Sequence, residues 1–212
     1  MSSELIAAIT DPMVRELASR GAVRSFPKNT VIINEGDRGD SLFVILSGRV
    51  KVYVSDDDGR EMILDQYGPG DYVGEMALDG RPRSASVMTL EPTSCSVVTR
   101  DALRAAIVAN ADVAMALIGT LIERARIATD NVKNLALMDV YGRVARLLLS
   151  IAKEQPDGKL VVPERMTQQD IADRVGASRD MISRIFKDLT IGGYVTVVDR
   201  IITINRKPPA RW

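Results

Sequence analysis

The chain has 212 residues, 46% of them hydrophobic and 26% charged, and its 28 Lys and Arg balance its 28 Asp and Glu. This composition is typical of one large or two small globular domains and excludes a disordered or fibrous chain. The absence of histidine and the presence of one cysteine exclude an internal disulfide and remove the usual ligands of zinc, haem and iron–sulfur clusters.

The charges are unevenly distributed along the chain. Residues 1–139 carry 15 Lys and Arg against 20 Asp and Glu, whereas residues 140–212 carry 13 against 8. The excess of positive charge predicts that the C-terminal part meets an anionic partner. Chance clustering of surface charge is the alternative.

The first 20 residues have apolar positions at helical spacing and no basic segment before them. We therefore expect a helical start, with neither a signal peptide nor a membrane span, and a cytoplasmic protein.

Residues 22–100 alternate short β-branched runs with Gly, Asp and Pro. This pattern predicts an antiparallel sheet domain, a roll or a barrel. The run SDDDGRE, residues 55–61, is predicted to be a hairpin turn whose acidic residues are solvated. The predicted strands include residues 30–33, 41–47, 49–54, 61–67 and 94–98.

Residues 111–137 predict one long helix, because they contain no proline and no strand-like alternation. Apolar residues at alternating steps of three and four form a seam typical of paired helices. The helix either packs only on its own domain or pairs with a second copy, and a further apolar side at Leu117, Ile122, Ile127 and Ala136 favours doing both. The predicted dimer interface consists of Ile118, Leu121, Ala125, Ala128, Val132 and Leu135.

After residue 139, the sequence predicts a helix over residues 140–155, a turn with a short strand over 156–164, and a final hairpin over 194–206. Between them, Thr167 and Ser178 are good N-caps for two short helices. Ala172, Gly176 and Ile182 have the spacing of a helix-turn-helix.

The second of these helices has features of a DNA-recognition helix. Ile182, Ile185, Phe186 and Leu189 are expected to face inward. Arginine can donate two hydrogen bonds to guanine, so outward Arg179 and Arg184 are candidate base readers rather than merely solvated charges. Lys187, Arg200 and Arg206 are expected to contact phosphate or nothing. The candidate DNA-binding residues are Thr167, Gln168, Gln169, Ser178, Arg179, Asp180, Ser183 and Arg184.

The stretch GEMALDGRPRSA, residues 74–85, contains the parts of an anion site. Gly74 allows close backbone approach, Glu75 can accept from a sugar hydroxyl, and Arg83 can pair with phosphate. Ser84 can complete the cradle with its hydroxyl and backbone N–H. A structural ion pair between Glu75 and Arg83 is the alternative.

Four sequence segments, GDYVGEMAL, RPRSASV, NLALMDVYGRVARLL and TQQDIADRVGASRDMISRIFKDL, resemble the cyclic AMP receptor protein/FNR (CRP/FNR) family of bacterial transcription regulators. The resemblance implies an α+β fold: an N-terminal antiparallel β-roll that binds a cyclic nucleotide (1–110), a long dimerisation helix (111–138) and a C-terminal winged helix-turn-helix (139–212). It also implies that Arg179, Asp180 and Arg184 read an operator, with aspartate where glutamate is commoner. The implied ligand-binding residues are Gly74, Glu75, Met76, Arg83, Ser84, Ala85 and Thr129.

Three differences from the family pattern concern the ligand. The segment between Glu75 and Arg83 is shorter than in many relatives, Ala128 and Thr129 replace a Thr-Ser pair that meets adenine, and Arg81 adds a cation. Cyclic AMP is the first expected effector, with cyclic GMP and cyclic di-GMP as alternatives. Ligand-independent DNA binding with a purely structural cassette is a further alternative.

The resemblance implies three partners and no cofactor. The partners are double-stranded DNA with an inverted-repeat operator, a second copy of the chain and RNA polymerase; no membrane is expected. We expect no enzyme activity, because the sequence offers no set of nucleophile, base and oxyanion donors.

Overall fold

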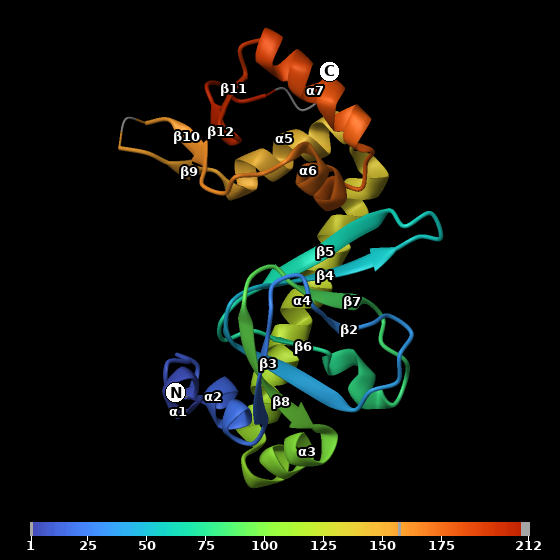
Figure 1. Ribbon diagram of the computed structural model, residues 1–212, viewed down its shortest axis with the longest axis vertical. Coiled ribbons are helices and arrows are strands. Elements are labelled where there is room, and N and C mark those ends of the chain that lie inside the picture. Colours follow the sequence, from blue (N-terminus) through green and yellow to red (C-terminus); the bar gives the residue numbers. More distant parts are fainter. Residues whose placement is uncertain (1, 157, 209–212) are drawn as a thin grey trace. The chain divides into compact units, whose positions relative to one another are not determined.

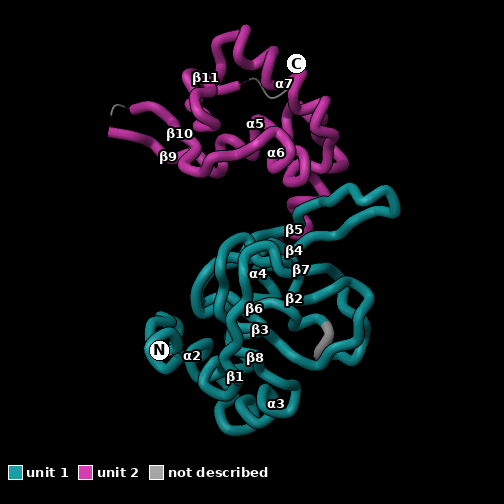
Figure 2. The backbone as a smooth tube through the Cα atoms, viewed as in Figure 1, with its two compact units in different colours: residues 1–125 teal, residues 126–212 magenta. Residues whose placement is uncertain are grey.

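The computed structural model describes residues 2–156 and 158–208, apart from the side chains of residues 77 and 78. The chain forms two compact units, residues 1–125 and 126–212 (Figure 2). The boundary between them falls inside the long helix α4, Ala111–Leu137. The division into 1–110, 111–138 and 139–212 stays a prediction.

The first unit is a β-roll of two antiparallel sheets (Figure 1). One sheet has the strand order β1-β8-β3-β6 and the other β2-β7-β4-β5. All the β-branched runs singled out in the sequence lie on these strands, so the predicted sheet domain is confirmed. The strands are β1 Ala22–Phe26, β2 Val31–Ile33, β3 Ser41–Ser47, β4 Val50–Ser55, β5 Glu61–Tyr67, β6 Tyr72–Val73, β7 Ser86–Thr89 and β8 Thr93–Thr99.

Two apolar clusters hold the roll together. One lies between the sheets and contains Ile33, Ile45, Val50, Val73, Val87 and Cys95. Burial in this cluster raises the pKa of the Cys95 thiol to about 12, so the thiol stays protonated. The other packs the helices α1 Ser2–Ala7, α2 Pro12–Ser19 and α3 Arg100–Ala109 against Leu42, Val44 and Val98.

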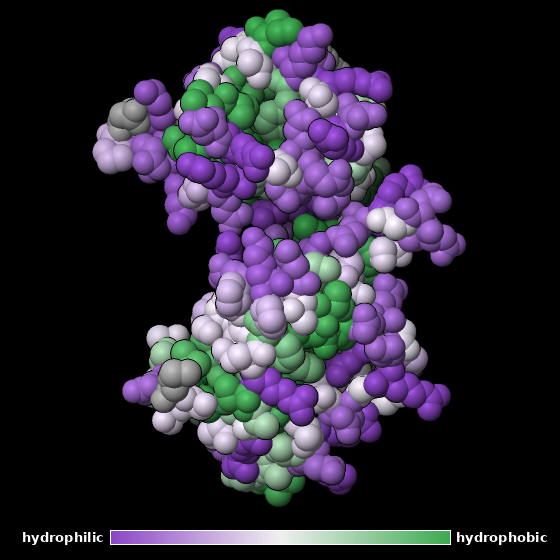
Figure 3. All heavy atoms as spheres, in the orientation of Figure 1, coloured by the Kyte–Doolittle hydropathy of each residue, from purple (hydrophilic) through white to green (hydrophobic). Residues whose placement is uncertain are grey.

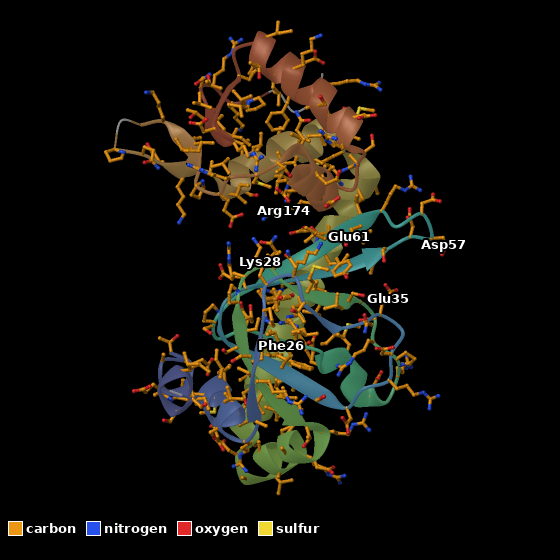
Figure 4. All side chains as sticks on the ribbon, viewed as in Figure 1. Phe26, Lys28, Glu35, Asp57, Glu61 and Arg174 are labelled. Carbon is orange, nitrogen blue, oxygen red and sulfur yellow. The ribbon has the colours of Figure 1, made fainter. Side chains whose placement is uncertain are left out.

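The hairpin between β4 and β5 ends in the acidic turn. Figure 4 shows Asp57 at its tip, and the side chains around the tip are hydrophilic (Figure 3). Within the turn, the Asp56 carboxylate accepts hydrogen bonds from the backbone N–H groups of Asp58 and Arg60 and from Arg60 Nε. These bonds lower the pKa of Asp56, and the turn is the solvated loop that the sequence predicts.

Helix α4 docks on the roll by a stripe that shares only Leu117 with the predicted one. Val113 is buried and Leu117 packs beside it, whereas Ile122 is 50% exposed and Ile127 39% exposed. The predicted docking side is therefore confirmed at Leu117 and wrong at Ile122. From Leu117 the docking stripe continues at helical spacing to the half-buried residues Thr120 and Arg124.

The second unit is a winged helix-turn-helix. Its strands form a sheet of order β11-β12-β10-β9, and its helices bury Leu148, Ile171, Ile182 and Leu189 completely or nearly so in one core. The elements are α5 Val140–Ile151, β9 Lys153–Glu154, β10 Leu160–Val162, α6 Gln168–Val175, α7 Arg179–Ile191, β11 Val195–Val198 and β12 Ile201–Ile204.

Helix α5 is shorter than predicted. It ends at Ile151, and Ala152 has extended backbone angles. Lys153 and Glu154 then pair with β10 instead of continuing the helix. The strand pairing satisfies their backbone groups, and the residue before Pro156 is disfavoured in a helix.

The wing is the hairpin of β11 and β12. Val198 pairs with Ile201, so Asp199 and Arg200 form a two-residue turn. Both have positive φ, 50° and 64°, as the right-handed twist of a hairpin favours. The predicted final hairpin is confirmed.

Candidate functional site

Arg83 is a buried cation in the first unit. Its side chain is among the few charged ones in the core, with 7% of the residue exposed. Nη1 donates to the carbonyl oxygen of Gly74 at 2.6 Å, and Nη2 donates to that of Ser41 at 2.8 Å. Burial lowers the pKa of Arg83, although the carboxylates of Asp40 and Glu75 act in the opposite direction. A buried cation held mainly by neutral carbonyls favours an added anion.

Two glycines make room for this guanidinium. A Cβ on Gly39 would lie 2.5 Å from Arg83 Nη2, and one on Gly74 would lie 2.7 Å from Nη1 and 3.1 Å from the Ser41 carbonyl oxygen. Gly74 also has φ of +89°, which L side chains rarely adopt. The glycine that opens the predicted anion site is therefore required by both its conformation and its packing.

Ser84 and Met76 meet beside Arg83. The Ser84 hydroxyl lies 3.2 Å from Met76 Sδ, and both residues are exposed. A thioether is a weak acceptor, so it gives up the Ser84 hydroxyl readily to a stronger one. The hydroxyl is thus available to an anion on Arg83.

Glu75 pairs with Arg124 of α4 and not with Arg83. Glu75 Oε1 is 2.7 Å from Arg124 Nη1, and the side chains are 13% and 17% exposed respectively. The predicted alternative of a structural Glu75–Arg83 ion pair is wrong. Because Arg124 pairs with Oε1, the Oε2 atom of Glu75 can accept a hydrogen bond from a hydroxyl.

Two tyrosine rings enclose Arg124. Its guanidinium carbon lies 4.4 Å from the Tyr67 ring centre and 5.0 Å from that of Tyr72, and Nη2 donates to the Tyr72 carbonyl oxygen at 2.5 Å. Burial alone would lower the pKa of Arg124, but Glu75 and the tyrosines raise it overall. Its buried Nε has no hydrogen-bond partner among the described residues. An acceptor on a bound ligand would satisfy it.

Arg124, Tyr67 and Tyr72 are residues of the candidate site that the sequence did not predict. A signal for Arg124 exists: Val113, Leu117 and Thr120 precede it at helical spacing on the docking stripe of α4. An arginine can continue an apolar stripe because its methylene stem packs against rings.

The remaining predicted ligand residues have less defined positions. Ala85 is half-buried and directly follows Ser84. Thr129 is exposed and lies on the part of α4 that belongs to the second unit. Its contact with a nucleotide stays a prediction. Arg81 is exposed and pairs with Asp79 at 3.4 Å.

The two helices of the C-terminal motif begin where the sequence predicts. Thr167 Oγ1 accepts from Asp170 N at 3.1 Å, and Asp170 accepts from Thr167 N, which forms a capping box. Ser178 Oγ accepts from Met181 N at 3.2 Å. Gly176, with φ of 64°, ends α6 in the left-handed conformation. These hydroxyls therefore act as helix caps, whether or not they also contact DNA.

Helix α7 separates its apolar and polar residues as predicted. Ile182, Ile185, Phe186 and Leu189 are buried. The candidate readers Arg179, Asp180, Ser183 and Arg184 are all exposed. Gln169 is exposed and donates to Asp173 at 2.6 Å, while Gln168 and Ser183 line a groove beside the wing with Lys187. The structure thus brings polar residues of both helices to one surface.

Arg143 stabilises the turn between the two helices. From α5, its guanidinium donates to the carbonyl oxygens of Val175 at 2.8 Å and Gly176 at 3.3 Å. It also donates to the Met138 carbonyl oxygen at 3.0 Å, just beyond the end of α4. One side chain thus links the helix-turn-helix to the segment that follows α4.

The predicted dimer seam of α4 is exposed in the single chain. Its large members, Ile118, Leu121, Val132 and Leu135, are between 42% and 66% exposed. Ala125 and Ala128 are exposed as well. A continuous apolar row open to water is typical of a surface that a partner covers.

Within the described residues, no single helix is both long and apolar enough to cross a membrane. The helices α3 and α4 meet the criteria of length and composition only as a pair, and that pair is bent by 117°.

Comparison with known proteins yields two family matches and many relatives. A family model for the cyclic nucleotide-binding domain matches residues 23–110, and one for the Crp-like helix-turn-helix domain matches residues 142–208. The cAMP-activated global transcriptional regulator CRP of Salmonella typhimurium is 31% identical over 202 residues, which cover 92% of this chain and 95% of that protein. A CRP-like cAMP-activated global transcriptional regulator of Mycobacterium tuberculosis is 35% identical over 184 residues, with 85% and 82% coverage.

The chain is also similar to a solved structure of a regulator that responds to a different nucleotide. The c-di-GMP responsive global regulator CLP of Xanthomonas campestris has a TM-score of 0.79 and 25% sequence identity. The match covers 91% of this chain and 97% of that protein. The predicted α+β fold, with its β-roll and winged helix-turn-helix, is confirmed.

Gly74→Ala tests the fit of the cradle, with Gly70→Ala as a matched control. Both glycines have φ near +90°, but a Cβ at Gly70 has no atom within 4 Å. Both variants should lose about 1 kcal/mol of folding stability through backbone strain. Only Gly74→Ala should also lose nucleotide affinity, by about tenfold or more, because it displaces Arg83. Chemical denaturation and calorimetry measure the two effects, and equal affinities in both variants would contradict the fit.

Proposed function

The chain belongs to the CRP/FNR family of transcription regulators, and from this premise we propose that it is a homodimer in which a cyclic nucleotide at Glu75 and Arg83 controls binding to an inverted-repeat operator. Members of the family are DNA-binding regulators and not enzymes. The observation that carries the proposal is the buried Arg83 guanidinium between Gly39 and Gly74, beside a carboxylate held by the long helix.

The ligand is held by its phosphate and its ribose. Arg83 and the Ser84 hydroxyl bind the phosphate, where a charge-assisted contact in a poorly hydrated site is strong. Glu75 accepts from the 2′-hydroxyl, and the ion pair with Arg124 keeps this carboxylate oriented. Gly74, Met76 and Ala85 line the cradle, and Thr129 meets the base.

Cyclic AMP is the first candidate effector. The relatives of Salmonella typhimurium and Mycobacterium tuberculosis are both called cAMP-activated. Cyclic di-GMP is the second candidate, because the similar structure of CLP is described as c-di-GMP responsive. Cyclic GMP is the third candidate, and ligand-independent DNA binding with a purely structural cassette is the competing hypothesis.

The effector acts through helix α4. The Glu75 carboxylate is paired with Arg124 of this helix. A ribose hydroxyl that donates to Glu75 adds a hydrogen bond to this ion pair. Ligand binding therefore favours one arrangement of α4, to the extent that the nucleotide binds that arrangement more tightly. Arg143, which contacts both the Met138 carbonyl and the turn before α7, carries the change to the DNA-binding unit.

DNA is read by helix α7 in the major groove. Arg179 and Arg184 donate hydrogen bonds to base edges. Asp180 either orients these arginines or accepts a hydrogen bond from a base. Thr167, Gln168, Gln169, Ser178 and Ser183 add phosphate or base contacts. The regulator acts in the cytoplasm, with RNA polymerase as its further partner.

Glu75→Gln tests the effector site. Calorimetry with cyclic AMP, cyclic GMP and cyclic di-GMP first shows which nucleotide the native protein binds. The variant should then lose about tenfold or more in affinity for the ribonucleotide, because a hydrogen bond to a charged acceptor is lost. Its loss for the 2′-deoxy analogue should be smaller.

The control for Glu75→Gln is Glu61→Gln. Glu61 is also paired, with Lys51, but lies on the β4–β5 hairpin. This variant should retain native affinity. If the native protein binds none of the nucleotides, the cassette is structural; if Glu75→Gln weakens both analogues equally, Glu75 does not contact the ribose.

Leu121→Lys and Val132→Lys test the dimer. Each places an unpaired charge in an interface whose members are apolar, which opposes burial. Sedimentation should detect monomers for both variants. Asp130→Lys should remain dimeric, because Asp130 is exposed on the face of α4 opposite the predicted seam. Dimers of both seam variants would show that another surface pairs.

Arg184→Ala and Lys187→Ala test DNA reading. The operator should be an inverted repeat with half-sites about 34 Å apart, one turn of DNA. Arg184→Ala should cost roughly 1–3 kcal/mol on this operator and relax the preference at one guanine per half-site. Lys187→Ala should weaken all sequences alike and reduce the salt dependence. Titrations with single-base operator variants at fixed salt distinguish the two, and an unchanged base preference in Arg184→Ala would assign that arginine to phosphate.

A further inference from the structure

Met76 combines exposure with a contact inside the proposed cradle. It lies on the short helix η1, Glu75–Asp79, directly after the carboxylate that pairs with Arg124. The residue is 61% exposed, and its Sδ is 3.2 Å from the Ser84 hydroxyl. The residue is thus open to small molecules in solution, and its sulfur contacts a group that would hold the ligand phosphate.

Few of the methionines in residues 2–156 and 158–208 have this exposure. Met166 is 5% exposed in the core of the second unit. Met115 on α4 is 63% exposed and Met181 on α7 is 40% exposed, and no hydrogen bond joins either sulfur to a described residue. Methionine oxidation depends on exposure, so Met115 and Met181 serve as internal references for the reactivity of Met76.

We propose that Met76 is a site of reversible oxidation by peroxide, and that its sulfoxide weakens binding of the nucleotide phosphate. This inference rests on the proposed function of Arg83 and Ser84 as a phosphate cradle. It adds an oxidant as a second input to the same site.

The reaction is a transfer of one oxygen atom. A sulfur lone pair of Met76 attacks one oxygen of hydrogen peroxide, the S–O bond forms and the O–O bond breaks. The departing hydroxide takes up the proton of the transferred oxygen and leaves as water. Sulfur is oxidised by two electrons and peroxide is reduced by two. Methionine sulfoxide reductases restore the thioether with two electrons from a pair of thiols, which become a disulfide, and the sulfoxide oxygen leaves as water.

The sulfoxide changes which group holds the Ser84 hydroxyl. A thioether sulfur is a weak acceptor, whereas a sulfoxide oxygen is a strong one with partial negative charge. The oxidised side chain therefore competes with the phosphate for the hydroxyl. It also sets a negative oxygen beside the anion that Arg83 attracts, and both effects lower affinity.

The experiment measures each protein before and after peroxide treatment. Peptide mass spectrometry follows Met76, Met115, Met181 and Met166 during exposure to hydrogen peroxide. Calorimetry with cyclic AMP, cyclic GMP and cyclic di-GMP then gives, for each nucleotide that binds, the ratio of the affinity of the reduced protein to that of the oxidised protein. Native protein should bind about two- to tenfold more weakly after oxidation, the loss expected for one hydrogen bond, and reductase treatment should restore it.

Matched variants assign the effect to Met76. The affinity ratio should be near one in Met76→Leu, which cannot be oxidised there, and native-like in Met115→Leu and Met181→Leu. In Ser84→Ala, Met76 should oxidise faster relative to Met115, because the hydroxyl no longer engages its sulfur; this readout needs no nucleotide.

The outcomes separate this inference from the proposed function. Binding of none of the three nucleotides to reduced native protein overturns the cradle itself and, with it, the effect of oxidation. Normal binding to reduced protein with an unchanged ratio after Met76 oxidation overturns only the inference. The inference alone is also overturned if Met76 stays reduced while Met115 and Met181 oxidise. It is likewise overturned if peroxide lowers the affinity of Met76→Leu as much as that of native protein.

Discussion

The first unit depends on a cation that the fold buries. Arg83 is enclosed by backbone: glycines on two sides leave the space, and the carbonyls of Gly74 and Ser41 accept its protons. The backbone of Arg83 is bonded to the loop that contains Gly36 and Asp37, so side chain and main chain are held together. Because carbonyl dipoles only partly compensate a buried charge, the site remains suited to an anion.

The neighbouring ion pair joins this site to the long helix. Glu75 follows Gly74 in sequence, yet its partner Arg124 is almost fifty residues away on α4. The rings of Tyr67 and Tyr72 shield the pair from water, which strengthens its electrostatic attraction. A ligand that changes the bonds of Glu75 therefore acts on a helix and not on a loop. The roll is therefore suited to sense a ligand and to transmit its binding to α4.

The helix-turn-helix achieves its geometry mainly by local means. Thr167 and Ser178 cap the helices, Gly176 turns the chain, and Arg143 bonds the carbonyls at the turn. Buried apolar residues of α7 leave its arginines on the outside. Helix capping and core packing thus place the arginines of α7 on an exposed surface. DNA contacts by a recognition helix depend on such exposed side chains.

Local rules determined much of this protein from its sequence. Alternating β-branched residues predicted the sheets, and caps and turn spacing predicted the two helices of the motif. The segment from Gly74 to Ser84 predicted an anion site, which stays a prediction. The tertiary structure decided what lies far apart in sequence: that Glu75 pairs with Arg124, that Arg83 bonds the carbonyl of Ser41, and that α4 docks through Arg124 and not through Ile122. It also ended α5 early, because pairing with β10 competes with the helix. Ion-pair partners and docking faces depend on which surfaces the fold brings together, and no local pattern records that choice.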